Sequence, residues 1–196
     1  MSAAETGSDE GLMAQLAQDQ DMALGELVRR YQNDVFRFCL HYVKNVETAK
    51  DMAQETFLRV YAARDRFDVR RKFKPWMLCI ARNLCLNELK RKKDVQMEAL
   101  EDYAGAARER TAELPQTAGD TPADVLIAQD RRQALHRLLA ELPDHSRELV
   151  ALRYFQRIPT REIAEIVEST EGAVRTRLHR VLKDLRGRCA PYREVL

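Results

Sequence analysis

The chain of 196 residues is poor in turn-forming residues, with only seven glycines and six prolines. A protein built from many β-strands needs more of both at its turns, so these counts argue against a many-stranded fold. Long apolar runs are also missing, and no stretch reaches the roughly 20 apolar residues of a membrane-spanning helix. The N-terminal stretch MSAAETGSDEGLM is acidic and small, unlike a secretion signal. We therefore expect a cytoplasmic, helix-rich protein without membrane insertion.

Metal-binding and catalytic motifs are equally scarce. The four cysteines include no CxxC pair, and the four histidines are scattered without metal-ligand spacing. The chain has no glycine-rich phosphate loop and no nucleophile motif. These patterns predict reduced thiols, no metal, no cofactor and no catalytic residue, so an enzyme is the least favoured class of protein.

The net charge of the chain says little about its partners, but the distribution of charge along the sequence says more. The formal net charge is only +2, yet residues 94–130 hold nine acidic residues against two arginines, a net charge of −7. Most of this stretch also loses the helical pattern of its neighbours and contains Gly105, Pro115, Gly119 and Pro122. Such composition is typical of an extended or flexible linker.

Helical periodicity dominates on both sides of this linker. Apolar residues recur at three- and four-residue steps, for example from Leu24 to Tyr42 and again from Val174 to Leu185. The sequence thus predicts an all-α fold with two small helical domains. The expected divisions are an N-terminal tail 1–11, a first domain 12–95, an acidic linker 96–122, a second domain 123–190 and a C-terminal tail 191–196. No further C-terminal domain is expected.

The second domain ends in a helix-turn-helix pattern. One apolar stripe runs along the last helix, while its arginines lie off that stripe. Thr170 is the expected N-cap, and the small Gly172 and Ala173 would let the start of the helix approach another surface closely. Ile163, Ala164 and Val167 give the preceding helix an apolar face; that helix is expected to brace the last one. In this arrangement the N-terminal end of the second helix enters a DNA major groove.

A second basic zone lies in the first domain, where residues 70–93 hold nine bases and one acid. Asn83, Asn87, Lys90 and Arg91 fall on one helical stripe, although asparagine is a poor residue for a helix interior. Bases and asparagines near Phe67, Phe73 and Trp76 suit unstacked single-stranded nucleic acid. The alternative is that these aromatic residues are core, and for Trp76 taken alone that alternative is favoured.

Three segments together carry a family resemblance. They are AKDMAQETFLRVYAARDRF from residue 49, KFKPWMLCIARNLCLNELKRKK from residue 72, and LAELPDHSRELVALRYFQRIPTREIAEIVESTEGAVRTRLHRVLKDLR from residue 139. In this order they resemble bacterial RNA polymerase sigma factors of the extracytoplasmic-function (ECF, group IV) family, in the sigma-70 superfamily. The resemblance extends from about residue 12 to residue 188. Independently of the resemblance, the stretch DHSRELVALRYF predicts a helix with Asp144 as its capping residue.

The resemblance implies a transcription initiation factor that binds core RNA polymerase through its β and β′ subunits and directs it to promoters. The implied polymerase-binding residues are Thr48, Asp51, Gln54, Glu55 and Phe57. The implied −10 residues, which would read and melt promoter DNA, are Arg66, Trp76, Asn83, Asn87, Lys90 and Arg91. The implied −35 residues are Thr170, Glu171, Gly172, Ala173, Arg175, Thr176, Arg177 and Arg180. The acidic linker would thread toward the active site and the RNA exit path, where its charge could occupy a basic channel.

The chain departs from the family pattern at two places. An acidic Asp-Ala-Glu-Asp-like run is usual at the polymerase-binding helix, but here Thr48 and Lys50 replace two of the acids. Phosphorylation of Thr48 by a Ser/Thr kinase would restore negative charge, whereas the simpler interpretation is tolerated drift. In the helix-turn-helix, Glu168 and Ser169 stand where the family often has glycine and an aliphatic residue. An anti-sigma factor is a further partner compatible with the resemblance.

A stand-alone helix-turn-helix regulator is the principal alternative. It would explain the DNA-binding pattern of the second domain and would bind specific duplex DNA without polymerase. It leaves the first domain's motifs and the acidic linker unexplained.

Overall fold

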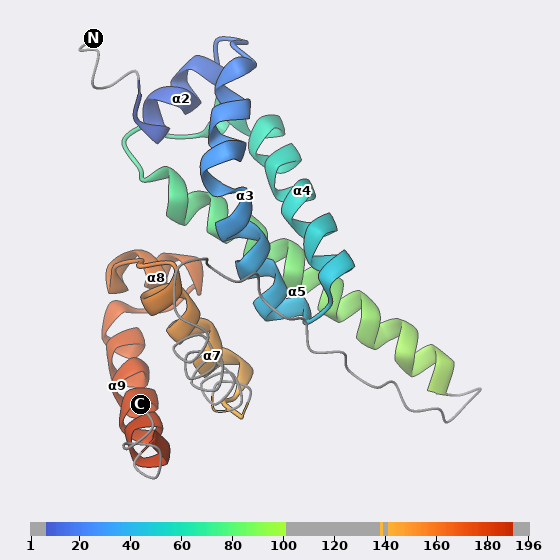
Figure 1. Cartoon of the computed structure of the whole chain (residues 1–196), viewed down its shortest axis with the longest axis vertical. Helices are drawn as coiled ribbons and strands as arrows, with labels where there is room; N and C mark the ends of the chain where they lie inside the picture. Colours follow the sequence, from blue (N-terminus) through green and yellow to red (C-terminus); the bar gives the residue numbers. More distant parts are fainter. Residues whose placement is uncertain (1–6, 101–137, 139–140, 190–196) are drawn as a thin grey trace, which may run out of the picture. The chain divides into compact units, whose positions relative to one another are not determined.

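The structure is a computed structural model and describes residues 7–100, 138 and 141–189. The chain divides into two units, Met1–Ala112 and Glu113–Leu196. The described residues form helices and contain no β-strand, in agreement with the predicted all-α class (Figure 1). The predicted linker at 96–122 lies outside the described residues, except that its first five residues continue the last helix of the first unit.

The first unit packs three long helices together and covers one end of them with a short helix. The long helices are α3 (Met22–Val43), α4 (Val46–Ala62) and α5 (Phe73–Leu100), with the 3-10 turn η1 (Arg64–Arg66) after α4. The short helix α2 (Asp9–Leu16) lies against α3 and α5 (Figure 1). Because α2 begins at Asp9, helical structure starts three residues before the expected start of this domain.

The core of the first unit follows the predicted period. Leu27, Val35 and Phe38 of α3 are buried, together with Val60 of α4 and Met77 of α5. Each such side chain contributes about 1.5–3 kcal/mol when it is fully buried. The core thereby fixes which faces of α4 and α5 remain on the surface.

The α3–α4 connection needs only two residues. Lys44 adopts a left-handed conformation with φ of 52° and ends α3, while the side chain of Asn45 accepts the backbone N–H of Thr48 and starts α4. A left-handed residue at a helix C-terminus and an asparagine N-cap are both common ways to satisfy exposed helix ends. The first turn of α4 is therefore firmly positioned.

The described part of the second unit contains α7 (Asp144–Val150), the π-helical turn η2 (Ala151–Phe155), α8 (Thr160–Ile166) and α9 (Glu171–Cys189). Of residues 123–140, the start of the predicted second domain, the structure describes only Leu138. Leu142, Leu149, Ile163 and Val174 are among the buried residues of this unit. They join α7, α8 and α9 around one core.

The start of α7 differs from the expectation. Pro143 occupies the N-cap position and Asp144 is the first helical residue, so the expectation that Asp144 caps this helix was wrong. The carboxylate of Asp144 instead pairs with Arg147 at 3.1 Å, and Arg147 donates a 2.8 Å hydrogen bond to the carbonyl of Leu142. Arg147 is buried and closes the turn before α7 in place of a side-chain cap.

Candidate nucleic-acid and polymerase interfaces

Helix α9 presents a polar, basic face beside a buried apolar one. Val174, Leu178 and Val181 are buried, as the stripe predicted. The hydroxyl of Thr170 accepts the backbone N–H of Ala173 at 3.2 Å, which confirms Thr170 as a capping residue. The exposed residues of the first turns include Gly172, Arg175, Thr176, Arg177 and Arg180. The exposed face at the beginning of α9 is therefore free of bulky apolar side chains and rich in arginine.

Glu171 organises this end of the helix. Its carboxylate binds the guanidinium of Arg175 at 2.7 Å and the hydroxyl of Thr160, on α8, at 3.2 Å. Glu171 thereby links the two helices of the motif. Part of the charge of Arg175 is satisfied within the protein, so Arg177 and Arg180 are the arginines best placed for an external contact.

The turn between α8 and α9 keeps its shape without glycine. Glu168 adopts the left-handed conformation with φ of 54°, and the N–H of Ser169 donates to the carbonyl of Ala164 at 2.8 Å. Ile163 and Ala164 are buried and Val167 is partly buried. The predicted apolar face and the helix-turn-helix connection are both present, with a non-glycine residue in a conformation that glycine adopts more easily.

The loop before α5 is shaped by Asp68. Its carboxylate accepts the backbone N–H of Arg70 at 3.0 Å and pairs with the Arg70 guanidinium, while its carbonyl accepts the N–H of Arg71 at 2.8 Å. The hydrogen bonds from Arg70 hold the pKa of Asp68 below its usual range. Such side-chain-to-backbone bonds are typical of tight turns. The loop is thus preformed, with Arg71 and Lys72 exposed.

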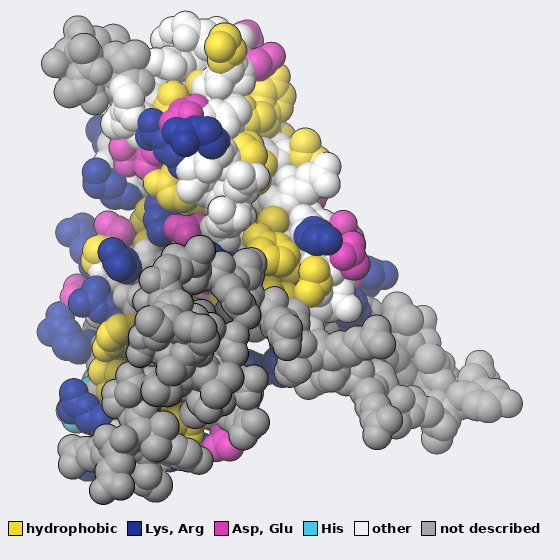
Figure 2. Space-filling view, viewed as in Figure 1, with side chains coloured by type: hydrophobic (Ala, Val, Ile, Leu, Met, Phe, Trp, Pro, Cys, Tyr) yellow, Lys and Arg dark blue, Asp and Glu magenta, His cyan; other side chains and the backbone are white. Residues whose placement is uncertain are grey.

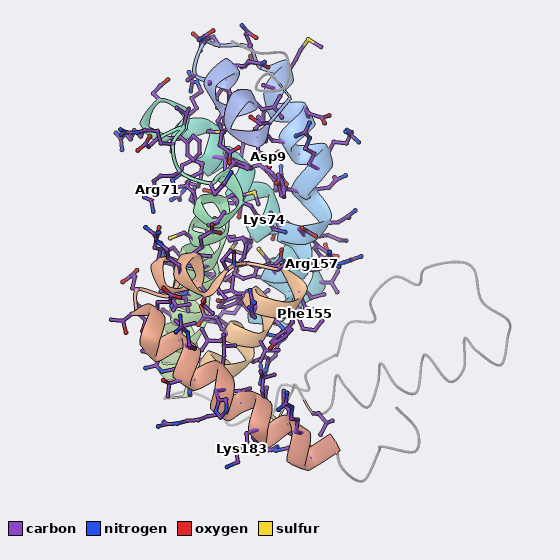
Figure 3. The ribbon with its side chains drawn as sticks, turned by 90° about the vertical axis from the view of Figure 1, so that its left-hand side faces the viewer. Asp9, Arg71, Lys74, Phe155, Arg157 and Lys183 are labelled. Atoms are coloured by element: carbon purple, nitrogen blue, oxygen red, sulfur yellow. The ribbon has the colours of Figure 1, made fainter. Side chains whose placement is uncertain are left out.

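Basic side chains gather around this loop. Figure 2 shows Lys and Arg along the edge of the first unit where the loop precedes α5, and Figure 3 labels Arg71 and Lys74 there. Arg66, a predicted −10 residue, is exposed in η1. Lys74 instead pairs with Asp34 of α3 at 2.8 Å, so its charge is partly satisfied inside the unit.

The aromatic residues of this region form one cluster. Phe67 and Phe73 are buried and belong to the core, whereas Trp76 is half-buried. The ring centroid of Trp76 lies 4.8 Å from that of Phe67 and 6.1 Å from that of Phe73. The two phenylalanines therefore support the loop from inside, and Trp76 is the aromatic residue that a base could reach.

The predicted stripe on α5 is on the surface. Asn83, Asn87, Lys90 and Arg91 are all exposed. Glu88 forms two hydrogen bonds of 2.9 Å with Arg91, which lower the pKa of Glu88 and raise that of Arg91. The arrangement offers two amides and a positively charged end along one helix face.

The predicted polymerase-binding residues are divided between surface and core. Asp51 and Gln54 are exposed, and Glu55 is partly exposed and pairs with Arg59 at 2.7 Å. Phe57 does not fit the expected surface, because its side chain is only 8% exposed and packs inside the unit. The neighbouring Leu58 is 55% exposed, and sequence reasoning missed it. Leu58 lies seven residues after Asp51 and four after Gln54, and this helical spacing could have placed it on the same face as these two residues.

Thr48 lies in the first turn of α4 and its hydroxyl has two partners. It is 3.1 Å from the side-chain oxygen of Asn45 and 3.1 Å from the amino group of Lys92 on α5. Lys50 pairs with Glu47 at 2.8 Å. Thr48, one of the two departures from the acidic pattern, is therefore hydrogen-bonded to α5. The charge of Lys50, the other departure, is balanced by the carboxylate of Glu47.

The cysteines Cys39, Cys79 and Cys85 are all free thiols. Cys39 and Cys85 are buried free thiols, and the neighbouring Cys85 and burial raise the pKa of Cys39, so its thiol stays protonated. In the part of the chain that the structure describes, no group of His, Cys, Asp and Glu could hold a metal ion. No helix within these described ranges is both long enough and apolar enough to span a bilayer.

Two family models match the sequence. The Sigma-70 region 2 model matches residues 27–95, and the Sigma-70, region 4 model matches residues 132–185. The chain is 32% identical to the ECF RNA polymerase sigma factor SigW of Bacillus subtilis over 169 residues, which is 86% of this chain and 89% of SigW. It is 26% identical to the ECF RNA polymerase sigma-E factor of Haemophilus influenzae over 194 residues, covering 96% and 98% of the two chains.

Solved structures show the same fold. CnrH in complex with the cytosolic domain of CnrY matches with a TM-score of 0.62 at 21% identity, covering 91% of this chain and 95% of that one. The sigma factor RpoE of Bartonella quintana, in complex with the anti-sigma factor NepR, matches with a TM-score of 0.64 at 20% identity, covering 83% and 94%.

Proposed function

Because the chain belongs to the ECF family of RNA polymerase sigma factors, which direct RNA polymerase to promoters, we propose that its two units each read one promoter element. Residues 12–95 form the unit that binds polymerase and the −10 element. Residues 123–190 form the unit that binds the −35 element, and 96–122 connect them. The observation that carries this proposal is the presence of a separate exposed basic surface on each unit.

The −35 element is read by the start of α9. Arg177 and Arg180 supply exposed guanidinium groups that can contact guanine edges or phosphates, and Thr176 adds a hydroxyl. Gly172 and Ala173 keep the helix start narrow enough to enter the major groove. Glu171 acts mainly by fixing α8 against α9 and by orienting Arg175.

The −10 element is read by the loop before α5 and by the stripe on that helix. Arg66 and the loop bases Arg71 and Lys72 attract the phosphate backbone, while Trp76 offers a stacking surface for an unpaired base. Asn83 and Asn87 contribute amide donors and acceptors farther along the same helix. Capture of unpaired bases would favour the melted state of the promoter.

Polymerase binds the exposed face of α4. Asp51, Gln54 and Glu55 form its polar part, and Leu58 replaces Phe57 as its apolar part. An apolar residue surrounded by polar ones is typical of an interface centre. The exposed face of α4 is also available to an anti-sigma factor, and so is the surface of the second unit. The sigma factor RpoE of Bartonella quintana is in complex with such a protein, the anti-sigma factor NepR.

Thr48 is proposed as a regulatory site on the same face. A phosphate there would stand at the positive end of α4 and beside Lys92, both of which favour negative charge. It would restore the charge that the acidic run of the family usually supplies. The protein itself performs no covalent chemistry in this proposal, because RNA synthesis belongs to the polymerase.

Run-off transcription tests the function directly. The protein is mixed with bacterial core polymerase and fragmented genomic DNA from its host, and transcripts are sequenced. Discrete transcripts that require the protein support the proposal, and their aligned start sites give both promoter elements. If the protein instead shifts specific duplex DNA alone and yields no transcript, the stand-alone regulator is correct.

A further inference from the structure

The N-terminal helix α2 is a part of the first unit that the family match does not include. The region 2 match begins at residue 27, whereas α2 ends at Leu16. Leu12, Met13 and Leu16 are nevertheless buried against the rest of the unit. Helix α2 is therefore an integral part of this unit.

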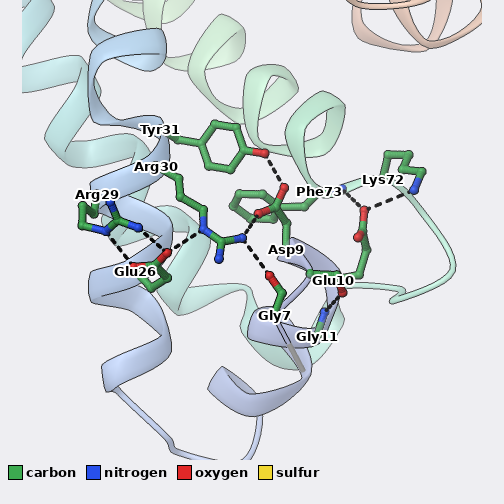
Figure 4. A network of polar contacts seen from close by, with 11 residues as sticks. Gly7, Asp9, Glu10, Gly11, Glu26, Arg29, Arg30, Tyr31, Lys72 and Phe73 are labelled. Atoms are coloured by element: carbon green, nitrogen blue, oxygen red, sulfur yellow. Dashed lines mark hydrogen bonds and ion pairs between the residues drawn. The ribbon is translucent and has the colours of Figure 1, made fainter. Parts of the chain in front are cut away.

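Glu10 of α2 binds the end of the DNA-reading loop. Its carboxylate accepts the backbone N–H of Phe73, the first residue of α5, at 3.2 Å, and lies 3.8 Å from the amino group of Lys72 (Figure 4). The first N–H groups of a helix have no partner within the helix. Glu10 thus caps α5 from a position 63 residues away in sequence.

Asp19 holds the other end of the same segment. It lies in the turn after α2, with φ of 57°, and its carboxylate accepts a hydrogen bond of 3.1 Å from the guanidinium of Arg64 in η1. Arg64 also lies over the ring of Tyr61, 4.5 Å from its centroid, and donates to the Tyr61 carbonyl at 3.2 Å. The N-terminal segment therefore contacts both ends of residues 64–73.

We propose that the N-terminal segment fixes the conformation of the −10-reading loop through Glu10 and Asp19, and thereby sets promoter discrimination. The inference rests on the proposed role of that loop in −10 recognition. Asp68 shapes the middle of the loop, while Glu10 and Asp19 fix where its ends are attached. Glu10 and Asp19 are positioning residues, because they act through the loop and not by touching DNA.

The same helix provides a matched control. Asp9 precedes Glu10 but binds α3, where it accepts hydrogen bonds from the guanidinium of Arg30 at 2.9 Å and from the hydroxyl of Tyr31 (Figure 4). Loss of Asp9 removes contacts of a similar number and kind but leaves the hydrogen bond from the Phe73 N–H to Glu10 in place. A role of α2 in stability alone would make Asp9 and Glu10 equivalent.

The experiment uses the full-length protein in holoenzyme with core polymerase. Templates carry a promoter found by the run-off assay, with either the −10 or the −35 element randomised, and the transcripts are sequenced. Glu10→Ala is expected to reduce discrimination among −10 sequences about fivefold, the scale of one lost helix cap, and to leave the −35 preference unchanged. Asp19→Ala should act in the same direction but more weakly, because the Asp19 side chain is 81% exposed. Asp9→Ala should preserve both preferences. Glu10→Gln, which can still accept the Phe73 N–H, should recover most of the −10 preference.

Two results would overturn the inference. One is unchanged −10 discrimination in Glu10→Ala at wild-type transcript levels. The other is equal loss of discrimination in Glu10→Ala and Asp9→Ala, which would leave α2 a purely structural role. Failure of the wild-type holoenzyme to transcribe any template would count against the proposed function instead, so the two failures are distinguishable.

Discussion

The amino group of Lys92 on α5 donates a hydrogen bond of 3.1 Å to the hydroxyl of Thr48 on α4. The bond connects the proposed polymerase-binding helix to the proposed DNA-binding helix. It also places a positive charge beside the position where the family usually has an acid. A negative group at residue 48 would therefore have a cation already in contact range.

Thr48→Glu is expected to bind core polymerase about two- to fivefold more tightly than wild type, the scale of one exposed charge interaction. The added carboxylate restores charge on the α4 face. Titration of labelled protein with core polymerase at low salt measures the affinity. Thr48→Gln, of matched size without charge, should show no gain, and equal affinity of Thr48→Glu and wild type would refute the regulatory proposal.

Arg177→Ala should lower transcription that depends on the −35 element by about tenfold, the discrimination carried by one arginine–base contact. Lys183→Ala is the control, because Lys183 is also an exposed base on α9 but lies farther from its N-terminal end (Figure 3). Run-off transcription from promoters with intact and mutated −35 elements separates the two. Equal effects of both substitutions would show that α9 contributes only general charge.

Glu168→Gly is expected to stabilise the second unit by about 1 kcal/mol. A left-handed residue with a Cβ is strained, and glycine removes this strain. Glycine also gives the unfolded chain more conformational freedom, which offsets part of the gain in stability. Glu165→Gly, in α8, should instead destabilise it by about 1 kcal/mol. Amide hydrogen exchange at Val174 and Leu178 reports opening of this unit specifically. A loss of protection in Glu168→Gly would mean that the turn gains stability from the glutamate side chain.

The Glu26 network predicts a pH dependence in the first unit. Hydrogen bonds from Arg29 and Arg30 lower the pKa of Glu26 from its ordinary value of 4.5 to about 2. The carboxylate thus contributes stability above pH about 4.5, and this contribution is lost as the pH falls toward about 2. The difference in melting temperature between wild type and Glu26→Gln should shrink over that range. Because the Glu26 side chain is partly exposed, the difference should be small and weaker in high salt. A difference independent of pH would contradict the assignment.

Features set by local periodicity were predicted well. The stripe containing Val174 and Leu178 repeats at the helical period, so its burial and the exposure of Arg177 both follow from spacing alone. The exposed face of Asn83 and Asn87 follows in the same way. Phe57 was placed on the surface by family resemblance, although an aromatic side chain in an amphipathic helix more often belongs to the core.

Contacts between distant residues could not be derived from the pattern. The hydrogen bond from the N–H of Phe73 to Glu10 joins residues 63 positions apart, and no repeat in the sequence indicates that α2 folds back on the start of α5. The Lys92–Thr48 bond is of the same kind, because its two residues are 44 positions apart. Asp144 shows that a local pattern can also be ambiguous. An aspartate near a helix start can either cap the helix or pair with an arginine one turn later, and here Asp144 pairs with Arg147.

Helix α5 is continuous over 28 residues, and its length has a consequence for DNA. With a rise of about 1.5 Å per residue, Phe73 and Arg91 are separated by about 27 Å along the axis. Stacked bases repeat about every 3.4 Å, so the stretch from Phe73 to Arg91 is as long as about eight stacked nucleotides. On the proposed assignment, the continuous helix α5 fixes the distance between the DNA-contacting groups of the loop and those at the far end of the stripe.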